Sequence, residues 1–70
     1  MALTEDIADD LAQQALALAR DEDDSLVDDI ATALGAGSQT LQEAFMTSIR
    51  VRRAEARARF LLEKRRGGSD

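Results

Sequence analysis

Only two places interrupt an otherwise helix-forming chain of 70 residues, and they divide it into three stretches. The first interruption is an acidic run at residues 21–24, and the second is Gly35-Ala36-Gly37. Proline, which breaks helix interiors, is absent. The rest is rich in Ala, Leu, Glu, Gln and Arg, which favour helix. The sequence therefore predicts an all-α fold of three helices in one domain, residues 1–66, with a disordered tail at 67–70.

The first helix is predicted from Thr4, which suits the N-cap position, to Arg20. One of its faces carries apolar residues at helical spacing and is widened by small alanines. We expect this face to pack on the other helices. Its members are Ile7, Ala8, Leu11, Ala12, Ala15, Leu18 and Ala19.

The second helix is predicted to begin at Ser25, with Asp28 at capping-box spacing. It is expected to end at Gly35-Ala36-Gly37, where glycine can adopt the left-handed conformation that terminates helices. Its apolar face consists of Leu26, Val27, Ile30, Ala31 and Leu34.

The third stretch begins at Ser38 or Thr40, where Thr40 and Glu43 form a capping box, and reaches Arg66. Its apolar pattern changes phase, because two sets of residues occupy faces about 120° apart. The first set is Leu41, Ala44, Phe45 and Ile49, and the second is Val51, Ala54, Ala58, Leu61 and Leu62. Either the chain breaks near residues 48–50, or one extended C-terminal helix has two partners.

The second apolar set predicts a homodimer. A three-helix monomer leaves that set exposed, and exposed apolar patches mark interfaces. A chain this short also has a small core, and without Cys or His it lacks disulfide and metal supports. We therefore expect Val51, Ala54, Ala58, Leu61 and Leu62 to form a dimer interface.

Charge is distributed unevenly along the chain. Residues 1–49 contain eleven acids and one base, a net charge of −10, whereas residues 50–70 contain eight bases and three acids, a net charge of +5. Opposite charges attract, so the two halves are expected to associate within a molecule or between copies.

The composition offers few groups for catalysis or metal binding. There is no imidazole or thiol, so the usual neutral-pH proton shuttle and the soft metal ligands are missing. Residues 21–29 have acids at EF-hand spacing, but Leu26 and Thr32 occupy the positions that require Gly and Glu. We predict no enzyme activity, no cofactor and no metal. No secretion signal or membrane span is recognisable, so a cytoplasmic location without membrane contact is expected.

Residues 30–45 read IATALGAGSQTLQEAF, and this segment resembles the helix-turn-helix of the AraC family of transcription regulators. The resemblance implies a helix-turn-helix-like core, with Ala31 at the helix crossing and Gly35 opening the turn. It also implies DNA as a partner. The candidate DNA-contacting residues are Ser38, Gln39, Gln42, Arg50, Arg52, Arg53 and Arg57. The sequence departs from the family at Gln39 and Glu43, which stand where arginine is usual.

A second function class stays open. The basic last helix could meet an acidic protein partner or the acidic half of a second copy, with its arginines paired to Glu55, Glu63 and the N-terminal half. The turn would then be only structural. The isoelectric point of about 4.5 favours this alternative, whereas the identities in residues 30–45 favour DNA binding.

Overall fold

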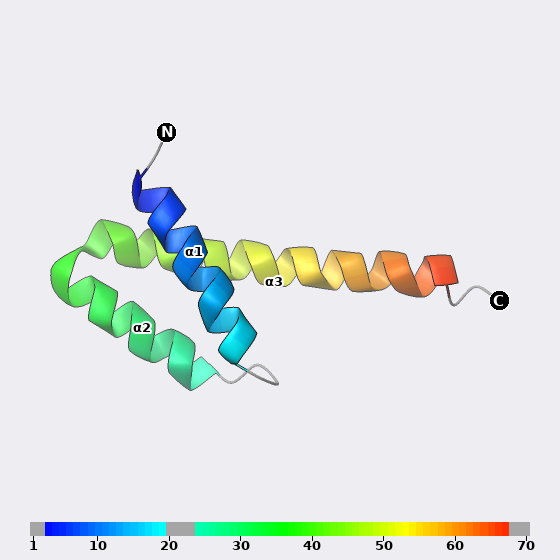
Figure 1. Ribbon diagram of the computed structural model, residues 1–70, viewed down its shortest axis with the longest axis horizontal. Helices are drawn as coiled ribbons and strands as arrows, with labels where there is room; N and C mark the ends of the chain where they lie inside the picture. Colours follow the sequence, from blue (N-terminus) through cyan, green and yellow to red (C-terminus); the bar gives the residue numbers. More distant parts are fainter. Residues whose placement is uncertain (1–2, 20–23, 68–70) are drawn as a thin grey trace.

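The computed structural model describes residues 3–19 and 24–67. These residues form three helices, α1 (Leu3–Leu18), α2 (Asp24–Gly37) and α3 (Gln39–Gly67). The predicted all-α fold and extended C-terminal helix are confirmed. Helix α1 crosses over α3, α2 runs back beside the N-terminal half of α3, and the rest of α3 projects freely (Figure 1).

Helix α3 is unbroken over 29 residues, which decides between the two alternatives for the third stretch. Its residues 54–67 are all exposed and are called the arm below. The remaining described residues form the body. Gly67, which was predicted to begin a disordered tail, is the last residue of the helix, so that boundary was wrong. Residues 68–70 lie outside the described part of the chain.

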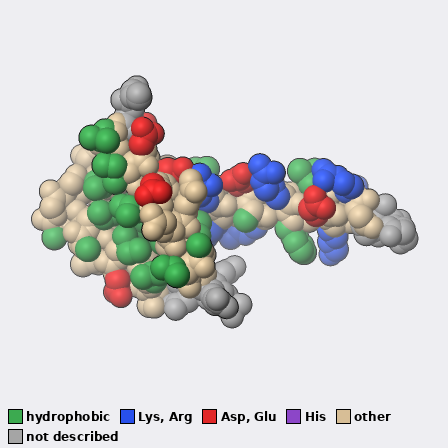
Figure 2. All heavy atoms as spheres, in the orientation of Figure 1, with side chains coloured by type: hydrophobic (Ala, Val, Ile, Leu, Met, Phe, Trp, Pro, Cys, Tyr) green, Lys and Arg blue, Asp and Glu red, His purple; other side chains and the backbone are tan. Residues whose placement is uncertain are grey.

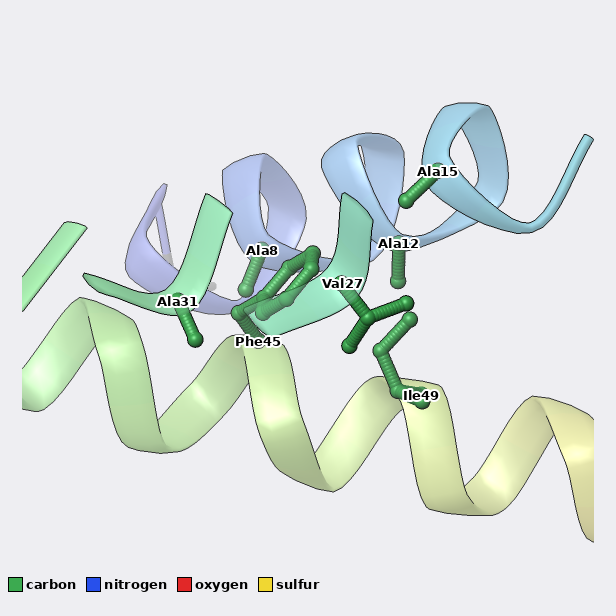
Figure 3. Close-up of a cluster of buried hydrophobic side chains, with 7 residues drawn as sticks. All are labelled: Ala8, Ala12, Ala15, Val27, Ala31, Phe45 and Ile49. Carbon is green, nitrogen blue, oxygen red and sulfur yellow. The ribbon is translucent and has the colours of Figure 1, made fainter. Parts of the chain in front are cut away.

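The core combines small side chains on α1 with large ones on α3. Phe45 and Ile49 of α3 are 0% and 2% exposed. They rise toward α1 and α2 (Figure 3). Burial of each of these side chains contributes about 1.5–3 kcal/mol. The other buried residues are Ala8, Ala12, Ala15, Val27 and Ala31.

The predicted core face of α1 was partly wrong. Ile7 and Leu18, expected inside, are 41% and 71% exposed. Three other members of that predicted face, Ala8, Ala12 and Ala15, are buried as expected. Alanines let the backbone of α1 approach α3 closely enough for Phe45 to fill the space between them. In this position, the larger apolar residues of α1 lie at the edge of its contact with α3.

Two predicted helix starts were also displaced. Helix α1 already includes Leu3, so Thr4 lies in the first turn and is not the N-cap. Helix α2 already includes Asp24, so Ser25 lies inside the helix as well. Arg20, the predicted end of the first helix, lies outside the described residues.

Ser38 alone separates α2 from α3, and it caps α3. The Leu41 backbone N–H donates to Ser38 Oγ at 3.1 Å, which is the N-cap interaction. The Ser38 backbone N–H donates to the Leu34 carbonyl at 2.7 Å. The alternative cap, Thr40 with Glu43, was wrong because α3 begins at Gln39 and Thr40 lies within its first turn.

Gly35 provides space for a side chain of α3. A Cβ on Gly35 would lie 2.5 Å from Gln42 Nε2, and this nitrogen donates to the Ala31 carbonyl at 2.8 Å. The predicted left-handed conformation was wrong. Gly35 and Gly37 both belong to α2, and neither has a φ in the left-handed region. Gly35 therefore serves the close approach of Gln42 at the α2–α3 corner.

Candidate interaction surface on α3

Arg52, where α3 leaves the body, binds Asp9 of α1 through two parallel hydrogen bonds. Nε donates to Oδ1 and Nη2 donates to Oδ2, both at 2.7 Å. The Arg52 hydrogen bond lowers the pKa of Asp9 from 3.8 to about 2, against a smaller opposing effect of desolvation. Gln13 adds a hydrogen bond to Asp9 at 3.2 Å. The two-point contact fixes α1 across α3.

Arg53, the next residue, binds the first turn of α2. Its Nη2 donates to Asp24 Oδ1 at 2.7 Å. Asp24 also suits the positive end of the α2 dipole. Neighbouring arginines of α3 thus hold the two other helices. The predicted attraction between the acidic and basic halves is confirmed within the molecule at these two contacts.

Most of the predicted DNA-contacting residues have partners within the chain, and the others are exposed. Ser38 is the cap of α3, and Gln42 is held against α2. Gln39 Nε2 lies 3.5 Å from Glu43 Oε2 on the same exposed turn. With Arg52 and Arg53, five of the seven therefore have partners inside the chain. Arg50 and Arg57 are exposed.

The arm is basic. It contains five Lys or Arg and two Glu, a net charge of +3. Glu55 accepts a hydrogen bond from Arg59 at 2.9 Å, and Glu63 accepts one from Arg66 at 2.7 Å, so the predicted pairing of the arginines with these glutamates is confirmed. In Figure 2 the visible Lys and Arg side chains lie along the projecting part of α3.

An apolar face runs along the same part of α3. Val51, Leu61 and Leu62 are 60%, 63% and 58% exposed, and Ala54 and Ala58 between them are exposed as well. These are the five residues predicted as a dimer interface, and the expectation that one chain leaves them uncovered is confirmed. They lie on the far side of α3 from the buried residues.

Helix α3 has further exposed features that its sequence did not predict. Phe60 is 65% exposed, and the Lys64 Nζ lies 6.0 Å from its ring centroid. With Ala56, Arg57 and Leu61, Phe60 lines an open apolar groove on the surface of α3. An open hollow of about 430 Å³ lies between α1 and the start of the arm. These features were not apparent from the sequence, because the apolar residues that form them do not follow an amphipathic period.

Within residues 3–19 and 24–67, no three acidic side chains converge in a way that could hold a metal ion. The acids at EF-hand spacing include Asp21 and Asp23, which lie outside the described residues. Over the same ranges, no helix has the length and apolar character that crossing a membrane requires.

No family model, curated protein or solved structure matches this chain. Among the described residues, the surface with the most distinctive chemistry is the exposed side of α3. It joins an apolar face to a net positive charge and stands clear of the body.

Proposed function

We propose that this chain is a non-enzymatic helical interaction module that binds another protein surface through the exposed side of α3. The observation that carries the proposal is the unpartnered apolar face, whose Val51, Leu61 and Leu62 are each more than half exposed. Folded proteins rarely leave such a contiguous set uncovered unless it serves binding. The flanking bases favour an acidic partner surface.

The two arginines at the base of the arm support the proposal over DNA binding. Arg52 and Arg53 are engaged by Asp9 and Asp24, so they are not available for phosphate without breaking contacts that hold α1 and α2. Gln42 is likewise engaged at the α2–α3 corner. A DNA-binding regulator remains the rival hypothesis, and its phosphate contacts would come mainly from Arg50, Arg57 and the end of the arm. The proposal keeps the expected cytoplasmic location.

A salt titration with duplex DNA tests the choice. Protein that binds phosphates releases counterions, so the affinity for DNA falls steeply as salt rises. We expect no binding of a mixed-sequence duplex beyond weak non-specific association at low salt, measured by fluorescence anisotropy. Tight binding whose salt slope is reduced by Arg50→Ala with Arg57→Ala would overturn the proposal in favour of DNA.

A comparison of two arm variants supplies the positive test. Leu61→Asp with Leu62→Asp alters the apolar face, whereas Glu63→Gln alters a neighbouring exposed position off that face. We expect hydrogen exchange of the arm amides to slow when wild-type protein binds its partner protein or self-associates. The same slowing should occur in Glu63→Gln and be lost in the double variant.

A further inference from the structure

The outer side of α3 carries a regular seam along the whole helix. Ala54 lies nine residues after Phe45, which at about 100° per residue is half a turn away from the core. Seam positions alternate by four and three residues, which is the spacing of a coiled coil. Its members, called the outer seam below, are Thr40, Ala44, Thr47, Val51, Ala54, Ala58, Leu61 and Arg65. All except the half-buried Ala44 are exposed.

We propose that the outer seam pairs with the outer seam of a second copy in antiparallel orientation, forming a homodimer. The inference rests on the proposed function and names its partner. Because the seam faces away from Phe45 and Ile49, α1 and α2 of each copy lie on the outside of such a pair. Neither of these two helices stands between the two seams.

Charge complementarity selects a second copy in this orientation. Residues 3–19 and 24–49 contain eight acids and no base, whereas residues 50–67 contain eight bases and two acids. Seven of these eight acids lie on α1 and α2, and Glu43 is the one on α3. Antiparallel pairing places each basic arm at the end of the dimer that holds the partner's acidic α1 and α2. Parallel pairing would bring the two acidic bodies together and the two basic arms together. Opposed helix dipoles add to the preference for the antiparallel pair.

The sizes of the seam side chains support one antiparallel register. In that register Val51 lies opposite the partner's Ala54, and Thr47 lies opposite the partner's Ala58. Ala44 lies opposite the partner's Leu61. Each layer combines a larger side chain with a small one, as close packing requires. In a parallel pair Ala54 and Ala58 would each face their own copies and leave voids, and Arg65 would face itself.

The residues flanking the seam add one favourable, one apolar and one unfavourable contact in this register. Glu43 comes near the partner's Lys64, and the two side chains have opposite charges. Leu41 comes near the partner's Leu62, and so the 58% exposed Leu62 side chain is covered. Arg50 comes near the partner's Arg57, and this like-charge pair weakens the dimer.

Replacement of that like-charge pair gives a first test. Arg57→Glu turns the contact with the partner's Arg50 into an ion pair on both sides of the dimer. The control is Arg57→Gln, which removes the arginine charge at the same position without adding an opposite one. We expect sedimentation analysis to show dimer affinity roughly threefold or more higher for Arg57→Glu than for the control. Equal or lower affinity would overturn the register.

Disulfide trapping gives the decisive test, because the chain has no cysteine of its own. Thr47→Cys and Ala58→Cys are prepared as separate proteins, since both positions are exposed. Antiparallel pairing brings position 47 of one copy to position 58 of the other. Two copies of the same position stay about 16 Å apart along the helix, from a rise of 1.5 Å per residue. That separation exceeds the span of a disulfide.

The mixture of the two variants should give a cross-linked dimer under mild oxidation, and each variant alone should give little. Cross-linking of each variant alone, or a wild-type mass of one 7.6 kDa chain at high micromolar concentration, overturns the proposal. The result is separable from the test of function. If the protein is a dimer that binds DNA, only the DNA titration contradicts its proposal, which is the proposed function. If the protein is a monomer that does not bind DNA, only the trapping experiment contradicts its proposal, which is the homodimer.

Discussion

Asp9 and Arg52 stand 43 positions apart in the sequence and meet through two parallel hydrogen bonds of 2.7 Å. Asp9 lies one residue after the buried Ala8, and Arg52 lies three residues after the buried Ile49. The ion pair therefore closes the edge of the same α1–α3 contact whose centre is apolar. Rotation of either helix would break both parts of the contact together.

The Asp9–Arg52 pair predicts acid sensitivity. The pKa of Asp9 is about 2 in the folded chain against an ordinary value of 3.8, so its ionised form is favoured by folding. This contribution to stability is fully present above about pH 4 and is lost as the pH falls toward 2. Asp9→Asn should lower the melting temperature at pH 7 and flatten its pH dependence between 4 and 2. Circular dichroism melts at a series of pH values measure both effects.

Asp10→Asn is the matched control for that experiment. The Asp10 carboxylate accepts a hydrogen bond from Gln14 on its own helix, so it does not join α1 to α3. Its substitution should leave the difference between pH 7 and pH 2 close to that of the wild type. An equal flattening in both variants would mean that the ion pair is not the cause.

The three helices were predictable from local signals, but the way they meet was not. Helix formers and two interruptions suffice to mark the helices, and the phase change in α3 marked both of its faces. The exposure of Ile7 beside the buried Ala12 depends on how closely α1 approaches Phe45, which no single-helix pattern contains. The charge asymmetry predicted attraction between the halves. It could not choose Asp9 for Arg52, because that choice depends on the crossing of two distant helices.

The corner between α2 and α3 predicts a coupling between Gly35 and Gln42. Alanine at position 35 favours helix by about 0.5–1 kcal/mol over glycine. Its Cβ would displace the Gln42 amide and break the hydrogen bond to the Ala31 carbonyl, at a cost of about 1 kcal/mol. We expect Gly35→Ala to be nearly neutral in the wild type and stabilising in a Gln42→Ala background. Urea unfolding of the four proteins measures the coupling, and strict additivity would contradict it.

The buried alanines of α1 predict that a larger side chain at one of these positions would overpack the contact with α3. Ala12 is 0% exposed, so leucine there must push α1 away from α3. We expect Ala12→Leu to lower the free energy of unfolding by about 1–3 kcal/mol. Ala33→Leu, at an exposed position of α2, is the control and should change it by less than about 0.5 kcal/mol. Tolerance of leucine at position 12 would show that the two helices are not in close contact.

The exposure of the arm predicts that its apolar residues contribute to association and not to the folding of a single chain. Leu61 and Leu62 have no place in the buried core, so Leu61→Asp with Leu62→Asp should leave the body folded. Measured in dilute, monomeric protein, the unfolding free energy should change by less than about 0.5 kcal/mol. Ile49→Asp, which places a charge in the core, should unfold the chain. Loss of helical signal in the arm double variant would mean that the arm contributes to the fold of a single chain.

The single-residue connection between α2 and α3 predicts that one hydroxyl sets the start of α3. Ser38 Oγ accepts the Leu41 backbone N–H at 3.1 Å, so Ser38→Ala leaves that donor without its partner. Loss of an N-cap of this kind costs about 1 kcal/mol. Thr40→Ala removes the other hydroxyl of the corner from an exposed position inside the first turn, where alanine is the better helix former. Ser38→Ala should therefore destabilise the chain in urea unfolding, while Thr40→Ala should be neutral or slightly stabilising. The reverse order would assign the cap to Thr40, and α3 would then begin two residues later than in this structure.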